Sequence, residues 1–83
     1  MIIIDVRTED EFDSGHINGA LHHDFEDMVQ GVFPDLSPDE TITVYCESGR
    51  RSQLAWGLMK DAGFKDVIDG GAMDDLIESI KYK

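Results

Sequence analysis

The sequence is poor in cysteine, in basic residues and in long apolar runs. Its one cysteine cannot form an internal disulfide and cannot by itself build a zinc site of the multi-cysteine kind. No apolar run approaches the roughly 18 residues that a membrane-spanning helix needs, so we expect no membrane partner. Seven basic residues stand against 18 acidic ones. The resulting net charge of -11 argues against nucleic acid as a direct partner, because phosphate backbones repel an acidic surface.

What the sequence does contain indicates a small globular protein. Of its 83 residues 41% are hydrophobic and 30% charged, a balance that is typical of a folded chain rather than a disordered one. A chain of this length forms one hydrophobic core, so we expect residues 1–83 to be a single domain. We also expect a monomer. The apolar run Ile2–Ile4 lacks the basic segment and the length of a secretory signal. We therefore expect a cytoplasmic protein, or a periplasmic one if a leader has been removed.

The pattern of apolar residues predicts an α/β fold. Runs of β-branched and apolar residues predict strands over residues 2–6, 41–45 and 66–69, with a weaker signal over 20–23. Apolar residues at helical spacing predict helices over residues 8–14, 25–33, 52–62 and 73–80. Strands that alternate with helices predict a central parallel sheet with helices on both faces, which makes three layers. Gly70 and Gly71 are expected in a tight loop after the last strand.

Cys46 follows the clearest predicted strand and precedes a predicted helix. Ligands of parallel sheets bind at the carboxyl ends of the strands, so chemistry is expected at this position. Gly49 allows a short loop to turn its backbone amides toward one point, and the next helix adds the positive end of its dipole. Arg50 and Arg51 add two positive charges, which Glu47 opposes. These features favour the thiolate of Cys46 and predict a pKa below that of a free cysteine.

Several motifs around this loop occur in the order found in one enzyme family. The loop C-E-S-G-R-R-S at 46–52 comes after I-D-V-R at 4–7 and G-H-I-N-G-A at 15–20. It is followed by A-G-F-K-D-V at 62–67 and by the glycine pair 70–71. Together these motifs cover nearly the whole chain and resemble the signature regions of rhodanese domains. The short length is most similar to the small single-domain type called phage shock protein E.

The resemblance implies a rhodanese-like fold and sulfur transfer in two steps without a cofactor. The Cys46 thiolate takes the outer sulfur of thiosulfate or a related donor and becomes a persulfide, and a thiophilic acceptor then removes that sulfur. The acceptor is cyanide in the assay and a thiol or a protein in the cell. The resemblance also implies a binding loop whose backbone amides hold the persulfide and whose last arginine closes the loop. This loop comprises Glu47, Ser48, Gly49, Arg50 and Arg51.

The chain departs from the family pattern in three places. The strand and helix that usually precede the D-V-R region are missing, so we expect a minimal version of the fold. Asn18 stands where the family usually has proline, and no tryptophan follows the double glycine. The last two departures concern packing more than chemistry.

Asp5 and Arg7 follow the first predicted strand and are therefore expected at the same end of the sheet as Cys46. They could contact a substrate as part of a second layer around the site. A structural pairing is the simpler interpretation, for instance of Arg7 with Glu11 one turn further along the chain.

The three histidines indicate no metal site. His16 lies in the G-H-I-N-G-A turn and is expected to make a structural hydrogen bond. His22 and His23 are neighbours on a weakly predicted strand and therefore point to opposite faces. Two ligands are also too few for a metal ion, so we expect none.

Other interpretations of the Cys46 loop remain open. A phosphatase with this fold would need arginine six residues after cysteine, whereas Ser52 stands there and Arg51 comes one residue earlier. A binding module without activity would not need Cys46, Gly49 and Arg51 together. A persulfide carrier that serves a protein partner is consistent with the acidic surface, which attracts free anions poorly. A buried, unreactive Cys46 would have only the packing role of a small hydrophobe.

Overall fold

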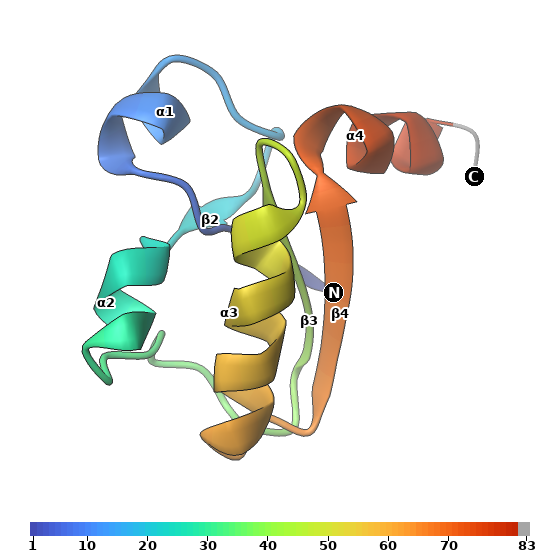
Figure 1. The fold of residues 1–83 in the computed structure, drawn as a ribbon. Helices are drawn as coiled ribbons and strands as arrows, with labels where there is room; N and C mark the ends of the chain where they lie inside the picture. Colours follow the sequence, from blue (N-terminus) through green and yellow to red (C-terminus); the bar gives the residue numbers. More distant parts are fainter. Residues whose placement is uncertain (82–83) are drawn as a thin grey trace.

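The computed structural model describes residues 1–81 as alternating strands and helices. In chain order the elements are β1 (Ile2–Asp5), α1 (Glu9–Asp13), β2 (Leu21–His22), α2 (Phe25–Val29), β3 (Thr41–Cys46), α3 (Arg50–Asp61), β4 (Asp66–Ala72) and α4 (Met73–Lys81). The four strands form one parallel sheet in the order β2-β1-β3-β4, and the helices surround it (Figure 1). The predicted α/β fold with a parallel sheet flanked by helices is confirmed.

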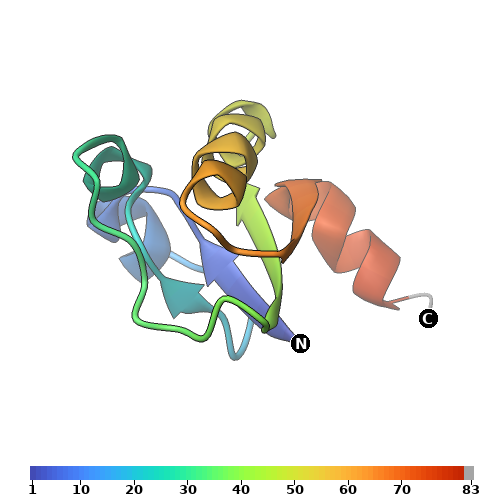
Figure 2. The same ribbon diagram turned by 90° about the horizontal axis from the view of Figure 1, so that it is seen from below.

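The two faces of the sheet carry different cores, because alternate residues of a strand point to opposite sides. Figure 2 shows α2 and α3 together on one side of the sheet. The buried cluster on that side contains Ile4, Val6, Met28, Ile42, Val44, Cys46, Ala55, Met59, Phe64 and Val67. A smaller cluster joins Ile17, Ala20 and Tyr45 to the partly buried Ile3, Met73 and Leu76. Consecutive residues of β3, Tyr45 and Cys46, therefore belong to opposite sides of the sheet.

Helix α2 is shorter than the apolar pattern predicted. It ends at Val29 instead of continuing to residue 33. Gly31 has a φ of +86°, a left-handed conformation that favours glycine, and its N–H donates to the carbonyl oxygen of Met28 at 3.0 Å. The N–H of Val32 donates to the carbonyl oxygen of Asp27 at 2.8 Å. This pair of bonds is a Schellman motif, which closes the helix before the apolar stripe runs out.

Strand β4 is longer than predicted, and the expected tight loop at the double glycine is not there. The strand runs through Gly70 and Gly71 to Ala72, with a shift of register opposite β3 between Val44 and Cys46. Glycine is required at position 70 because a Cβ atom there would lie 2.9 Å from both the Thr43 side chain and the Val44 carbonyl oxygen. The strand therefore extends to Ala72, which is paired with Cys46. The sequence pattern predicts a strand that ends at residue 69 and does not reach the cysteine.

Within residues 1–81, none of the helices has both the length and the apolar character that crossing a membrane would require.

Candidate functional site

Cys46 is the last residue of β3 and is completely buried. The chain then passes through an exposed Glu47 and Ser48 to Gly49, which precedes α3. Gly49 has a φ of +90°, so the turn into the helix depends on the conformational freedom of glycine. Helix α3 begins at Arg50, two residues earlier than predicted, which puts its first turn directly beside the cysteine.

Backbone N–H groups converge on the sulfur of Cys46. Gly49 N–H lies 3.0 Å and Ser52 N–H 3.3 Å from Sγ. The Ser52 hydroxyl donates to the carbonyl oxygen of Gly49 at 3.1 Å and thereby supports the turn. Burial would raise the pKa of Cys46, but the hydrogen bonds from Ser52, Gly49 and Ser48 outweigh it, and the pKa is lowered. Of the loop amides expected around the sulfur, that of Gly49 is within hydrogen-bond distance, and the second donor is Ser52, which the sequence had not indicated. These amides favour the thiolate.

We expect the pH midpoint of Cys46 alkylation by iodoacetamide to lie below that of a free cysteine, roughly 8.5. The amides stabilise the thiolate, which is the form that reacts. Ser52→Ala should move the midpoint upward, because the Ser52 hydroxyl supports the turn that holds the amides against the sulfur. Alkylation rate against pH measures both midpoints. A midpoint at or above that of a free cysteine would contradict the role of the amides.

Arg51, in the first turn of α3, is paired with Glu11 of α1. Its Nη1 and Nη2 atoms donate to the two carboxylate oxygens of Glu11 at 2.7 and 3.0 Å. Glu11 also completes the expected capping box with Thr8, whose N–H donates to Oε1 at 3.1 Å. The hydrogen bonds from Arg51 lower the pKa of Glu11 to about 2. The pair therefore contributes its full stability above about pH 4.5 and loses it as the pH falls toward 2.

Arg7 lies in a buried polar cluster with Asp5 and Tyr45. Arg7 Nε and Nη2 donate to the Asp5 carboxylate at 3.0 and 2.8 Å, and the Tyr45 hydroxyl donates to the same carboxylate at 2.8 Å. The exposed fraction is 0% for Asp5 and 3% for Arg7. The predicted pairing of Arg7 with Glu11 is wrong, because Asp5 satisfies the guanidinium inside the molecule while Glu11 pairs with Arg51. The hydrogen bond with Asp5 raises the pKa of Arg7 above its ordinary value.

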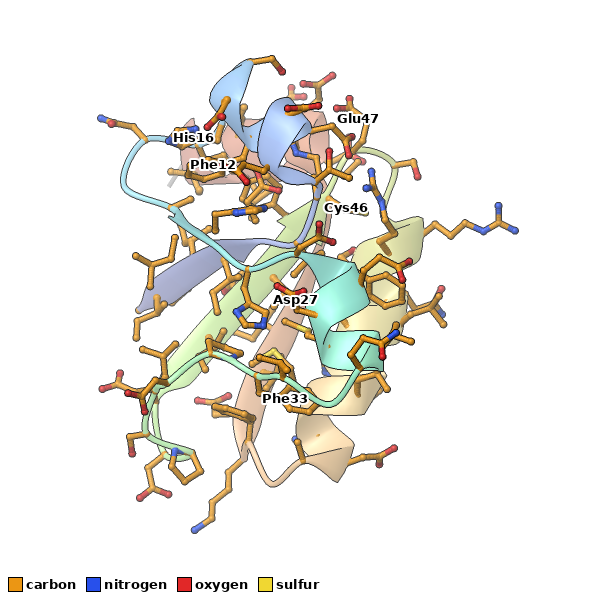
Figure 3. The ribbon with its side chains drawn as sticks, turned by 90° about the vertical axis from the view of Figure 1, so that its left-hand side faces the viewer. Phe12, His16, Asp27, Phe33, Cys46 and Glu47 are labelled. Atoms are coloured by element: carbon orange, nitrogen blue, oxygen red, sulfur yellow. The ribbon has the colours of Figure 1, made fainter. Side chains whose placement is uncertain are left out.

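The buried cluster reaches the Cys46 loop through Glu47. Arg7 Nη1 donates to Glu47 Oε1 at 3.1 Å, and Nη2 donates to the carbonyl oxygen of Gly15 at 2.6 Å. Figure 3 shows Cys46 and Glu47 at the end of the sheet next to α1. Arg7 thus connects the loop after the cysteine to the turn that follows α1. This is the structural interpretation of Asp5 and Arg7 that the sequence favoured.

Of the two arginine charges expected at the site, that of Arg51 is compensated by a carboxylate and that of Arg50 lies at the surface. Arg7 and Arg51 are both paired with carboxylates, and the partner carboxylates come from Asp5, Glu47 and Glu11. Arg50 is exposed at the surface of α3. The groups that lie within hydrogen-bond distance of Cys46 Sγ are backbone amides, not guanidinium groups. The site is therefore a neutral cradle of N–H groups surrounded by ion pairs.

Tyr45 is the residue of this cluster that the sequence analysis missed. Its hydroxyl donates to Asp5 and accepts from the N–H of Ile17 at 3.0 Å. Burial raises its pKa to about 12, so it stays protonated and remains a donor. The signal that could have identified it is the strand register. Asp5 and Tyr45 are paired positions on adjacent parallel strands, which puts their side chains on the same face.

The histidines make local hydrogen bonds. His16 Nδ1 is 2.8 Å from the carbonyl oxygen of Phe12, and its ring stacks on the Phe12 ring with centroids 3.6 Å apart (Figure 3). His22 and His23 place Nε2 atoms 2.7 and 2.8 Å from backbone carbonyl oxygens. Among residues 1–81, no three His, Cys, Asp or Glu side chains are grouped so that they could hold a metal ion.

Comparison with known proteins assigns the sequence to one family and shows relatives of different kinds. The family model described as Rhodanese-like domain matches residues 1–74. YrkF of Bacillus subtilis (strain 168), whose name marks it as a proposed sulfur carrier protein, is 39% identical over 67 residues. That match covers 81% of this chain but only 36% of YrkF. The thiosulfate sulfurtransferase PspE of Escherichia coli (strain K12) is 28% identical over 76 residues, which cover 88% of this chain and 71% of PspE.

Solved structures show the same fold. The crystal structure of the rhodanese-like domain of the Alr3790 protein from Anabaena sp. matches with a TM-score of 0.79 at 30% sequence identity. The match covers 96% of this chain and 76% of that domain.

Proposed function

The chain belongs to the rhodanese-like domain family, and we propose that it transfers sulfur as a persulfide on Cys46. The proposal takes residues 1–83 as one rhodanese domain. The observation that carries it is the convergence of the Gly49 and Ser52 amides on Sγ, at the carboxyl end of a central strand. Such a cradle stabilises an anionic sulfur, whether that is the thiolate before transfer or the terminal persulfide sulfur after it.

The proposed reaction has two displacement steps on sulfur. The Cys46 thiolate attacks the outer sulfur of thiosulfate, a new S–S bond forms, and sulfite leaves with the electron pair of the broken S–S bond. A thiophilic acceptor such as cyanide or a thiolate then attacks the terminal sulfur of the persulfide. The Cys46 thiolate leaves and is ready for the next donor. No cofactor or metal takes part, because both steps are nucleophilic displacements at sulfur.

Mass spectrometry of the intact protein tests this proposal. After incubation with thiosulfate and removal of the donor, the protein should have gained the mass of one sulfur atom. Cyanide should remove that mass and release thiocyanate. A protein that gains no sulfur from thiosulfate, from an alkyl persulfide or from a desulfurase loaded with sulfur would refute a sulfur-transfer role for Cys46.

A second candidate, a persulfide carrier that serves a protein partner, is favoured by the ion pairs around the loop. Arg7 and Arg51 are paired with carboxylates, and the chain carries a net charge of -11. A free divalent anion is therefore attracted weakly, whereas a protein donor can supply its own docking contacts. The sulfur-carrier name of YrkF adds support to this candidate. Faster loading by a persulfidated protein than by thiosulfate at equal concentration would select the carrier.

We expect Glu47→Gln to lower the KM for thiosulfate by about 2- to 5-fold. The substitution removes the exposed carboxylate next to Cys46, and a surface charge contribution of up to about 1 kcal/mol corresponds to this range. The matched control is Glu26→Gln in α2, which changes the net charge equally at an exposed position outside the Cys46 loop. Steady-state rates of thiocyanate formation measure the KM for thiosulfate of both variants. Equal effects of the two substitutions would mean that only the overall charge matters.

A further inference from the structure

A groove lies on the face of the sheet that α2 and α3 do not cover. It has a volume of about 290 Å³ and runs between the sheet and α4. Its main lining residues are Ile3, Thr43, Ile68, Asp69, Leu76 and Ile80. The smaller core cluster lies on this face and shares Ile3 and Leu76 with the lining of the groove, which therefore lies beside that cluster. Cys46 belongs to the core on the opposite face.

The walls of the groove expose large apolar side chains from two elements. Ile68 of β4 is 44% exposed, and Ile80 of α4 is 45% exposed. Ile77, 42% exposed, lines a second hollow with Ile80 on the side of α4 that faces residues 16–18. The apolar side chains therefore form a continuous patch from the sheet across α4. A patch of this kind on a small protein indicates a binding surface.

The rim of the groove is acidic. Asp69 and Asp75 both line it, and none of the basic side chains of residues 1–80 does so. Asp74 and Glu78 are exposed on the same helix. A second copy of this chain would bring an equally acidic rim and a further net charge of -11, so self-association through this surface is disfavoured. A partner that carries Lys or Arg side chains beside its apolar residues is complementary to this groove in both charge and polarity.

The free edge of the sheet argues against a partner that adds a strand. β4 is an edge strand, and side chains already engage two of its backbone groups. Trp56 Nε1–H donates to the carbonyl oxygen of Val67 at 2.9 Å, and Asp69 Oδ1 accepts from the N–H of Gly71 at 3.0 Å. Edge groups satisfied in this way are poor templates for strand addition. A groove with apolar walls instead suits a helix that lays one apolar face into it.

We propose that the groove lined by Ile3, Ile68 and Ile80 binds a basic amphipathic helix of a partner protein. This surface is separate from the Cys46 loop, and the inference does not depend on the sulfur chemistry. Because the groove and the cysteine are on opposite faces of the sheet, a partner bound in the groove lies on the other side of the sheet from the Cys46 sulfur. The helix would place Lys or Arg side chains beside Asp69 and Asp75.

The test uses the whole chain and a designed amphipathic Leu/Lys peptide of about four helical turns as the probe. In NMR titration we expect the shift changes to cluster at the groove residues. Ile80→Ser should weaken binding about tenfold, because burial of this side chain contributes on the order of 1.5 kcal/mol. The matched control is Leu54→Ser in α3, since Leu54 is similarly exposed at 55% but lies on the other face. That variant should bind normally.

A second pair of variants separates local from overall charge. Asp75→Asn at the groove should weaken binding of the Leu/Lys peptide, whereas Asp61→Asn at the end of α3 should not, although both change the net charge equally. Shift changes scattered over the acidic surface, or equal effects of the two substitutions, would overturn the proposal. A dimer in sedimentation analysis that Ile80→Ser dissociates would also overturn it, because the occupant would then be a second copy.

Discussion

Cys46→Ser should reduce thiocyanate formation by on the order of 10³-fold or more while leaving the protein folded. A serine hydroxyl fits the buried position and can accept the same hydrogen bonds from Gly49 and Ser52 N–H. It cannot form a persulfide, and its alkoxide is inaccessible near neutral pH. The rate of thiocyanate formation from thiosulfate and cyanide measures the loss.

The control for this prediction is the mass of the protein after incubation with the donor. Cys46→Ser should gain no sulfur, and its free energy of unfolding should stay within about 1 kcal/mol of the unaltered protein, since no core volume is removed. Cys46→Ala should be equally inactive but less stable, because the two N–H groups then face no acceptor. Substantial turnover by either variant would exclude Cys46 as the sulfur carrier.

Asp5→Ala should lower the free energy of unfolding by about 3–5 kcal/mol. Asp5 is fully buried, and its carboxylate accepts hydrogen bonds from the Arg7 guanidinium and the Tyr45 hydroxyl. Removing it leaves the buried guanidinium with the exposed Glu47 carboxylate as its one remaining counter-charge, and Arg7 loses the contact that holds it between Gly15 and Glu47. A domain of this size has roughly 4–12 kcal/mol of stability in total, so much of the protein should unfold. Urea denaturation measures the change.

Two further variants separate charge burial from simple loss of contacts. Tyr45→Phe removes one hydroxyl and leaves the N–H of Ile17 without its acceptor, so it should cost about 1–3 kcal/mol, less than Asp5→Ala. The double variant Asp5→Leu with Arg7→Met replaces the ion pair by apolar groups and should be more stable than Asp5→Ala alone. If the double variant is less stable than Asp5→Ala, an unpaired buried charge is not the reason why Asp5→Ala lowers the free energy of unfolding.

Much of the site could be predicted from local sequence. The strand before Cys46, the conformational freedom of Gly49 and the helix that follows are properties of neighbouring residues, and the structure has all of them. Thr8 and Glu11 form the predicted capping box because cap and partner are three residues apart. Placement of the cysteine at the carboxyl end of a central strand followed from the alternation of strands and helices.

The partners of the charged side chains could not be predicted in the same way. Glu11 pairs with Arg51 and Arg7 with Glu47, each across 40 positions in the sequence. The spacing along the sequence favoured an ion pair between Arg7 and Glu11, because spacing can indicate contacts only between residues that are close together in the chain. Which carboxylate reaches which guanidinium depends on how α1 and the Cys46 loop meet, and only the packed structure determines that.

The sequence alone determined the alternating elements, the parallel sheet and the amide-rich loop around Cys46, because local conformation and apolar spacing control them. The tertiary structure decided that Arg7 and Arg51 are paired with carboxylates, that Tyr45 completes the buried cluster, and that one face of the sheet keeps an open apolar groove with an acidic rim. Each of these depends on distances between segments far apart in the chain, which only folding brings together.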